Sequence, residues 1–289
     1  MKRDAFSQCH PAVNFIFYLG AIGFGVVIQH PAYLAVGFVA SAGYYAMRNI
    51  RAFPKTLLGL LPVFVILAGI NPLFNTYGSR VLFSVFGRPY TWEALAHGMA
   101  VGAMFVVMML WFFTYSQVMT SDKFLSLFSG LIPSLALLLT MVLRLIPNLM
   151  RKAQQLLGSR RSIGKGAAGD APVKQRLTEG MTLVSALTDW LLEGSIITAD
   201  SMRSRGYGTA QRTHFRIYRF TLRDGLLLAI LILLAAATLA LGSFEASYTP
   251  QWQIDSPGWG LATYGGYLCI PMILQGKEEL QWRISISGI

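Results

Sequence analysis

The sequence is poor in the residues that usually form disulfides and metal centres. Its 289 residues include two cysteines and four histidines. Cys9 lies near the N-terminus and Cys269 lies within an apolar stretch, so we expect no disulfide between them. The histidines are scattered without the spacing of metal ligands. We therefore expect neither a metal centre nor a disulfide framework.

Charged residues are scarce as well. They make up 13% of the chain, against roughly 25% in an ordinary soluble domain, while 54% of the residues are hydrophobic and the mean hydropathy is +0.51. This composition predicts a polytopic membrane protein of the all-α class. The formal net charge is nevertheless +11. In a membrane protein such an excess first indicates cytoplasmic loops, and no nucleic-acid-binding signature accompanies it.

Six apolar segments approach the length of about 20 residues that a membrane-spanning helix needs. The positive-inside rule sets their orientation, because cytoplasmic loops are enriched in Lys and Arg. With both termini in the cytoplasm, only Arg80 and Arg88 of the 24 basic residues lie outside. The fourth segment contains Gly98 and Gly102, which form a close-packing pattern for helices in lipid. The predicted spans are residues 13–29, 32–47, 56–70, 94–118, 225–241 and 259–274.

A further apolar stretch, residues 124–143, is predicted not to cross the membrane. A basic block at 144–223 follows it and holds 14 of the 24 Lys and Arg residues. A crossing would place all of them outside, so we expect an interfacial or re-entrant segment, broken near Pro133. The chain then divides into transmembrane helices 1–4 (residues 1–121), a cytoplasmic and interfacial helical region (122–223), and transmembrane helices 5–6 with a cytoplasmic tail (224–289).

The middle region is expected to contain two long amphipathic helices, 134–157 and about 178–205, joined by a loop at 158–172 that is rich in Gly, Ser, Arg and Lys. Gly206 suits the left-handed residue that follows a helix end. Arg205 then fits two readings: a cation that complements the helix dipole, or a group presented to a partner's carboxylate. Four polar residues of the second helix share one face: Asp189, Glu193, Asp200 and Arg203.

The sequence does not fully match any of the catalytic or ion-transport motifs considered. The spans hold almost no ionisable residues, which argues against an ion-coupled secondary transporter. Residues 158–166 look like a P-loop but lack its spacing and its Ser or Thr. Glu278, Glu279 and Arg283 match a pattern of intramembrane metalloproteases, but they lie beyond the last span and have no histidine pair. A stand-alone membrane transporter or membrane-embedded enzyme is the alternative to a docking protein.

Four segments carry a resemblance to a known family, one of them being residues 91–95, Thr-Trp-Glu-Ala-Leu. Residues 201–207, Ser-Met-Arg-Ser-Arg-Gly-Tyr, resemble the Ala-Met-x-Ala-Arg-Gly-Tyr signature of the transmembrane T component of energy-coupling factor (ECF) transporters, the CbiQ/EcfT family. Residues 9–15 and 71–75 also resemble that family. The resemblance implies six spans with cytoplasmic coupling helices, in the plasma membrane of a prokaryote. It also implies two ABC-type ATPase partners that bind ATP and Mg²⁺, a small substrate-binding S component for a vitamin or similar micronutrient, and no cofactor on this chain.

The resemblance also implies docking residues. Ser204, Arg205 and Gly206 match an X-Arg-X motif that binds an ATPase, with Arg203 beside it. A second such motif is expected at the end of the preceding helix, where Leu157 and Gly158 stand and Leu157 replaces the arginine. Either Arg160 or Arg161 supplies that contact, or the contact is apolar. The resemblance further implies a contact with the S component on the apolar face of the second helix, at Met181, Val184, Leu187 and Leu191.

Overall fold

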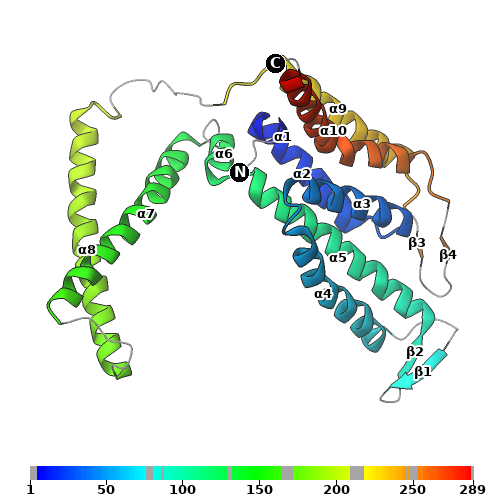
Figure 1. The fold of residues 1–289 in the computed structure, drawn as a ribbon, viewed down its shortest axis with the longest axis horizontal. Helices are drawn as coiled ribbons and strands as arrows, with labels where there is room; N and C mark the ends of the chain where they lie inside the picture. Colours follow the sequence, from blue (N-terminus) through cyan, green and yellow to red (C-terminus); the bar gives the residue numbers. More distant parts are fainter. Residues whose placement is uncertain are drawn as a thin grey trace. The chain divides into compact units, whose positions relative to one another are not determined.

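A computed structural model shows the fold (Figure 1). It describes residues 5–75, 81–85, 88–128, 132–164, 172–208, 218–244, 246–247, 253–254 and 256–287. The chain forms two compact units. The first combines Met1–Phe124 with Tyr218–Ile289, and the second is Leu125–Ile217.

The first unit is a bundle of helices with two short hairpins. The hairpins pair β1 with β2 and β3 with β4, both antiparallel. The strands are β1 (Val81–Val85), β2 (Arg88–Thr91), β3 (Ala246–Ser247) and β4 (Gln253–Ile254). The helices are α1 (Ala5–Gln8), α2 (Pro11–Val27), α3 (Pro31–Arg48), α4 (Phe53–Phe74), α5 (Trp92–Val118), α6 (Ser121–Phe128, which reaches into the second unit), α9 (Leu222–Leu241) and α10 (Gly260–Ser287).

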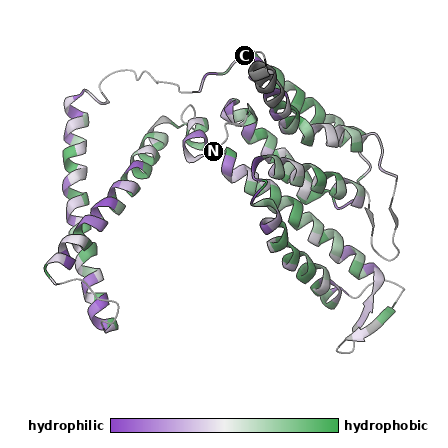
Figure 2. Cartoon of the chain, viewed as in Figure 1, coloured by the Kyte–Doolittle hydropathy of each residue, from purple (hydrophilic) through white to green (hydrophobic). Residues whose placement is uncertain are grey.

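The second unit contains two long helices that contact each other. They are α7 (Pro133–Ser162) and α8 (Val173–Ser204). Arg160 lies 3.8 Å from the carboxylate of Glu179, and the Nζ atom of Lys152 lies 5.8 Å from the centre of the Trp190 ring. Figure 2 shows hydrophilic and hydrophobic residues alternating along both helices, whereas α4 and α9 are almost uniformly hydrophobic. This distinction matches the amphipathic character predicted for the middle region.

Local sequence determines where several helices begin. His10 and His30 each precede a Pro-Ala pair, and the Nδ1 atom of each histidine accepts a hydrogen bond of 3.2 Å from the alanine N–H. Proline suits the first helical position because its missing N–H would have no partner there. Helix α9 begins with a capping box between Thr221 and Asp224. The other oxygen of Asp224 accepts from the backbone N–H of His10 at 3.0 Å, which joins the starts of α9 and α2.

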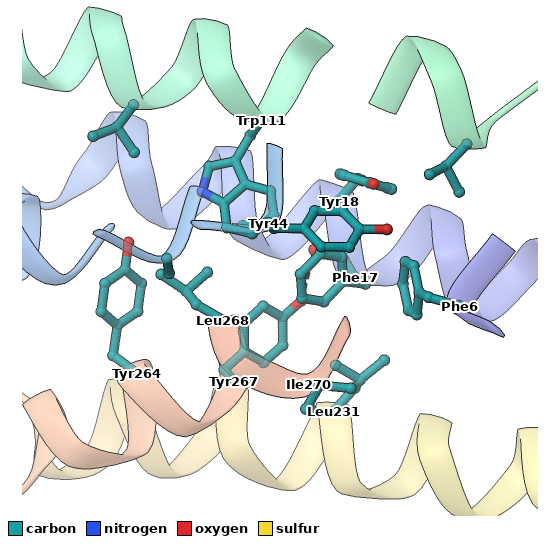
Figure 3. Close-up of a cluster of buried hydrophobic side chains, with 14 of the residues drawn as sticks. Phe6, Phe17, Tyr18, Tyr44, Trp111, Leu231, Tyr264, Tyr267, Leu268 and Ile270 are labelled. Atoms are coloured by element: carbon teal, nitrogen blue, oxygen red, sulfur yellow. Dashed lines mark hydrogen bonds between the residues drawn. The ribbon is translucent and has the colours of Figure 1, made fainter. Parts of the chain in front are cut away.

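An aromatic core holds α2, α3, α5 and α10 together (Figure 3). Phe17 stacks on Tyr267 at 5.4 Å between ring centroids and meets Trp111 edge-on at 5.5 Å. The Tyr267 hydroxyl donates to the backbone carbonyls of Ile16 and Phe17, so its polar end has a partner despite its burial. Tyr44 stacks on Trp111, with 6.1 Å between the ring centroids.

The pair α4 and α5 packs through glycine. A Cβ atom on Gly98 would lie 2.6 Å from the backbone oxygen of Ala68, and one on Gly102 would lie 3.0 Å from the ring of Phe64. These two residues are the small-xxx-small pattern seen in the sequence, and the structure confirms that the pattern marks a close helix contact.

Lys123 connects the N-terminal helix to the ends of α5 and α6. It is buried, and its Nζ atom donates to the backbone carbonyl and the hydroxyl of Ser7 and to the carbonyl of Val118. Burial of an ammonium group costs free energy unless its donors are satisfied. Three acceptors provide that compensation here.

The chain is an all-α membrane protein, as the sequence predicts. Four helices of the described residues are long and apolar enough to cross a membrane: Phe53–Phe74, Trp92–Val118, Ser134–Ser162 and Leu222–Leu241. Three of them contain predicted spans. The fourth, Ser134–Ser162, overlaps residues 124–143, which are predicted not to cross, although this helix is a candidate span by its length and composition. The predicted spans 13–29, 32–47 and 259–274 fall largely on α2, α3 and α10, of which α2 is apolar but has only 17 residues.

The region around Pro133 matches one expectation and corrects two others. Helix α6 ends at Phe128 and α7 begins at Pro133, so the predicted break is confirmed. The loop predicted at 158–172 is wrong at its start, because α7 continues through Gly158 to Ser162. The second helix begins at Val173, five residues earlier than predicted.

Candidate docking site at the end of α8

Helix α8 ends in a well-formed glycine cap. Gly206 has a φ of +72°, as the sequence predicts. Its N–H donates to the carbonyl of Arg203 at 3.0 Å, and the N–H of Tyr207 donates to the carbonyl of Met202 at 3.1 Å. This pair of bonds is a Schellman motif, which satisfies carbonyls that the helix end would otherwise leave unpaired. The cap therefore fixes the backbone direction at Arg205.

The side chain of Arg205 is available to a partner. Residues 203–206 are all exposed, and the guanidinium group of Arg205 makes no hydrogen bond or ion pair with any residue that the structure describes. The Ser204 hydroxyl, in contrast, is satisfied by the carbonyl of Ser201 at 3.0 Å. A guanidinium group presents five N–H donors in a planar fork that matches a carboxylate. The tip of α8 can therefore bind an acidic or carbonyl-rich pocket.

The predicted polar face of α8 is exposed along its length. Asp189, Glu193, Asp200 and Arg203 are all exposed, and their spacing of 4, 7 and 3 residues places them on one side of the helix. Solvent and partners can reach this face without rearrangement of α7 and α8.

The position expected for the other docking motif is not a helix end. Leu157 and Gly158 lie inside α7, and the carbonyl of Gly158 accepts a hydrogen bond from the Ser162 hydroxyl at 3.1 Å. Helix α7 ends instead at Ser162, with Gly164 at a φ of +72°. The assignment of Leu157 and Gly158 to a helix end was therefore wrong, and the sequence reasoning missed Ile163 and Gly164.

Arg160 and Arg161, which are predicted to replace the missing arginine of the second docking motif, differ in their surroundings. Arg160 lies 3.8 Å from Glu179 of α8, so its charge is partly compensated within the unit. Arg161 is exposed, and its carbonyl accepts from the Gly164 N–H at 3.0 Å. Their docking role stays a prediction.

The four residues predicted to contact an S component divide into two pairs. Met181 and Val184 are 74% and 62% exposed, so they are open to a partner. Leu187 and Leu191 are half-buried, in the stretch of α8 where Trp190 meets Lys152 of α7. The first pair is thus the more accessible part of the predicted surface.

Nothing in the described part of the chain gathers into a metal-binding group of three or more His, Cys, Asp or Glu residues. The groups that the described part of α8 exposes are a charged tip at one end and apolar side chains along its length.

Comparison with known proteins agrees with this description. No model of a known protein family matches the sequence. A curated protein from Leuconostoc gelidum subsp. gasicomitatum, the energy-coupling factor transporter transmembrane protein EcfT, is 30% identical over 187 residues, which cover 60% of this chain and 69% of that protein. The matched length and the all-helical membrane fold identify the chain as a membrane component of an ECF-type transporter. The chain belongs to the EcfT family of energy-coupling factor transporter transmembrane proteins.

Proposed function

We propose that this T component docks two cytoplasmic ABC-type ATPase subunits and transmits their movement to a small membrane S component that binds the transported micronutrient. The single observation that carries the proposal is Arg205: an arginine on a rigid cap at the end of a long helix, exposed and without a partner among the described residues. ATP and Mg²⁺ bind to the ATPase subunits, and this chain binds no cofactor.

The length of α8 supports a mechanical role. Its 32 residues span about 48 Å at 1.5 Å per residue. Met181 lies 24 residues before Arg205, or roughly 36 Å along the helix axis. A force applied by an ATPase at the tip would move this apolar surface, because a helix transmits displacement along its hydrogen-bonded backbone. The S component would contact Met181 and Val184 first, with Leu187 and Leu191 behind them.

The orientation of the chain follows from the same proposal. ATPase subunits are cytoplasmic, so the C-terminal ends of α7 and α8 lie on the cytoplasmic side of a prokaryotic plasma membrane, and both chain termini are cytoplasmic. This orientation leaves the basic block at residues 144–223 inside, in agreement with the positive-inside rule.

Co-purification tests the proposal. The chain is expressed with a C-terminal affinity tag in its native host and extracted in mild detergent, and the ATPase subunits that accompany it are identified by mass spectrometry. Loss of a buried, charge-assisted arginine contact costs about 2–5 kcal/mol, so Arg205→Ala and Arg205→Glu should lose most of the ATPase. Arg51→Ala removes an exposed arginine from the first unit and serves as the matched control. Wild-type ATPase recovery with both Arg205 variants would contradict the proposal.

A further inference from the structure

The ends of α7 and α8 have nearly the same sequence. Helix α7 closes with Arg161-Ser162-Ile163-Gly164, and α8 closes with Arg203-Ser204-Arg205-Gly206. In each case the serine is the last helical residue and the glycine stands two positions beyond it. Only the third residue differs.

The two ends also share their backbone geometry. Gly164 and Gly206 both have a φ of +72°, and each N–H donates to the carbonyl three residues earlier at 3.0 Å. The residues before them are equally alike, with φ and ψ of −97° and 15° at Ile163 and −82° and 7° at Arg205. The helix ends therefore hold the side chains of Ile163 and Arg205 in equivalent positions.

The two ends lie far enough apart for separate partners. Both belong to the second unit, where the contact between Arg160 and Glu179 places the end of α7 beside the first third of α8 (Figure 1). From Glu179 to Ser204 is 25 residues, or about 38 Å of helix. Two globular subunits can thus bind the two ends at the same time.

The exposed groups at the two ends differ in chemistry. Ile163 is 68% exposed and lies in a segment rich in Gly, Ser and Arg, so its apolar side chain is open to a partner. Isoleucine cannot pair with a carboxylate, and a carboxylate buried against it would lose its hydrogen bonds without compensation. A partner that binds this end must offer an apolar pocket.

The proposed function requires a second ATPase contact, which the family's pattern places at the end of α7; we propose that Ile163, in the position equivalent to Arg205, makes that contact and that the contact is apolar. The inference rests on the proposed function and adds that the two docking contacts are chemically unequal. The occupant is an ATPase subunit because both helix ends have the same Arg-Ser pair, the same left-handed glycine and an exposed side chain between them. Each ATPase subunit of a pair needs one such tip.

Binding measurements on single variants test this assignment. The chain is placed in nanodiscs, and its Kd is measured for the ATPase subunits that mass spectrometry identified with the wild type. Ile163→Asp should raise the Kd at least about tenfold, because a charge replaces a side chain that fills an apolar pocket. Ile163→Leu should keep the wild-type Kd. Leu157→Asp is the comparison variant, because Leu157 is the exposed apolar residue of the same helix to which the sequence analysis assigned this contact, six residues before Ile163. The inference predicts that Leu157→Asp keeps the wild-type Kd.

A photo-crosslinking residue in place of Ile163 gives a second readout that does not depend on affinity. It should yield an adduct with an ATPase subunit, and the same residue in place of Leu157 should not.

The outcomes separate the inference from the proposed function. A wild-type Kd for Ile163→Asp together with a loss of binding for Arg205→Glu overturns the inference and leaves the proposed function intact. A loss for Leu157→Asp but not for Ile163→Asp also overturns it. Wild-type binding by Arg205→Glu contradicts the proposed function, whatever Ile163→Asp shows. The inference is supported if Ile163→Asp loses binding, if Ile163→Leu and Leu157→Asp keep it, and if the crosslinking residue at position 163 gives the ATPase adduct.

Discussion

The contact between α4 and α5 predicts an unusual penalty for a single methyl group. Alanine in place of a helical glycine ordinarily stabilises a helix by about 0.5–1 kcal/mol. At Gly98 the added Cβ would lie 2.6 Å from the backbone oxygen of Ala68 and 3.0 Å from the Cβ of Asn71. Carbon atoms in good contact are about 3.5–4.0 Å apart, so the helices must separate to accept the methyl group.

The free-energy cost of that separation depends on which atom the added methyl group would clash with. The oxygen of Ala68 belongs to the backbone of α4 and cannot move without the helix, unlike the end of a flexible side chain. Overpacking of this kind typically costs about 1–3 kcal/mol. After the gain in helix propensity, we expect Gly98→Ala to destabilise the protein by roughly 0.5–2 kcal/mol.

Gly69 provides the matched control. It lies on α4 next to Ala68, and a Cβ there would meet nothing within 4 Å. Gly69→Ala should therefore be neutral or slightly stabilising. Unfolding by SDS in mixed micelles, followed by circular dichroism, compares the two variants with the wild type. The packing argument is refuted if Gly98→Ala is as stable as Gly69→Ala.

Three further substitutions test other parts of the fold and the docking tip. Lys123→Met leaves the carbonyl and hydroxyl of Ser7 without their donor and should destabilise the protein by about 1–3 kcal/mol in the same SDS assay; wild-type stability would show that these bonds contribute nothing. Asp224→Ala removes the capping box with Thr221 and should cost about 0.5–2 kcal/mol, with faster amide exchange in the first turn of α9 and at the His10 N–H, which loses its acceptor; unchanged exchange in the first turn of α9 would contradict the capping role. Gly206→Ala places a side chain on a residue with a φ of +72°, at a cost of about 1–2 kcal/mol. The backbone amides in the last turn of α8 should therefore exchange faster, and ATPase binding should weaken. Wild-type amide exchange and ATPase binding would show that the cap does not position the tip.

The features that the sequence predicted are those that depend on local patterns. Gly206 follows a long helical repeat and two arginines, and its left-handed conformation needs no information from elsewhere in the chain. The small-residue pattern of Gly98 and Gly102 also predicted a close contact. Its partner, α4, could not be predicted, because a pattern on one helix does not say which neighbour fills the groove.

The end of α7 shows why glycine is an unreliable sign of a helix end. Gly158 suggested that the helix stops there, yet the helix continues for four more residues. Glycine within a helix costs only about 1 kcal/mol, which other interactions can offset. The continued helix positions Arg160, which then lies 3.8 Å from Glu179 of α8. The repeated Arg-Ser-x-Gly sequence at both helix ends was the signal that would have located the true end at Gly164.

The predicted S-component surface shows a similar limit. Periodicity grouped Met181, Val184, Leu187 and Leu191 as apolar residues of one helix, but the arrangement of the two helices makes the first pair exposed and the second half-buried. Sequence periodicity identifies apolar faces, whereas the position of a neighbouring helix decides which of them remain open.

ATP-driven uptake tests the central claim most directly. The chain, its ATPase subunits and the S component recovered with it are reconstituted in proteoliposomes, with ATP supplied on the side where the ATPase subunits bind and the micronutrient on the other. The account predicts that Arg205→Glu keeps the S component bound to the chain but loses ATP-driven uptake, while Arg51→Ala transports at the wild-type rate. Wild-type uptake by Arg205→Glu would contradict the claim that the tip of α8 transmits the work of ATP hydrolysis to the membrane.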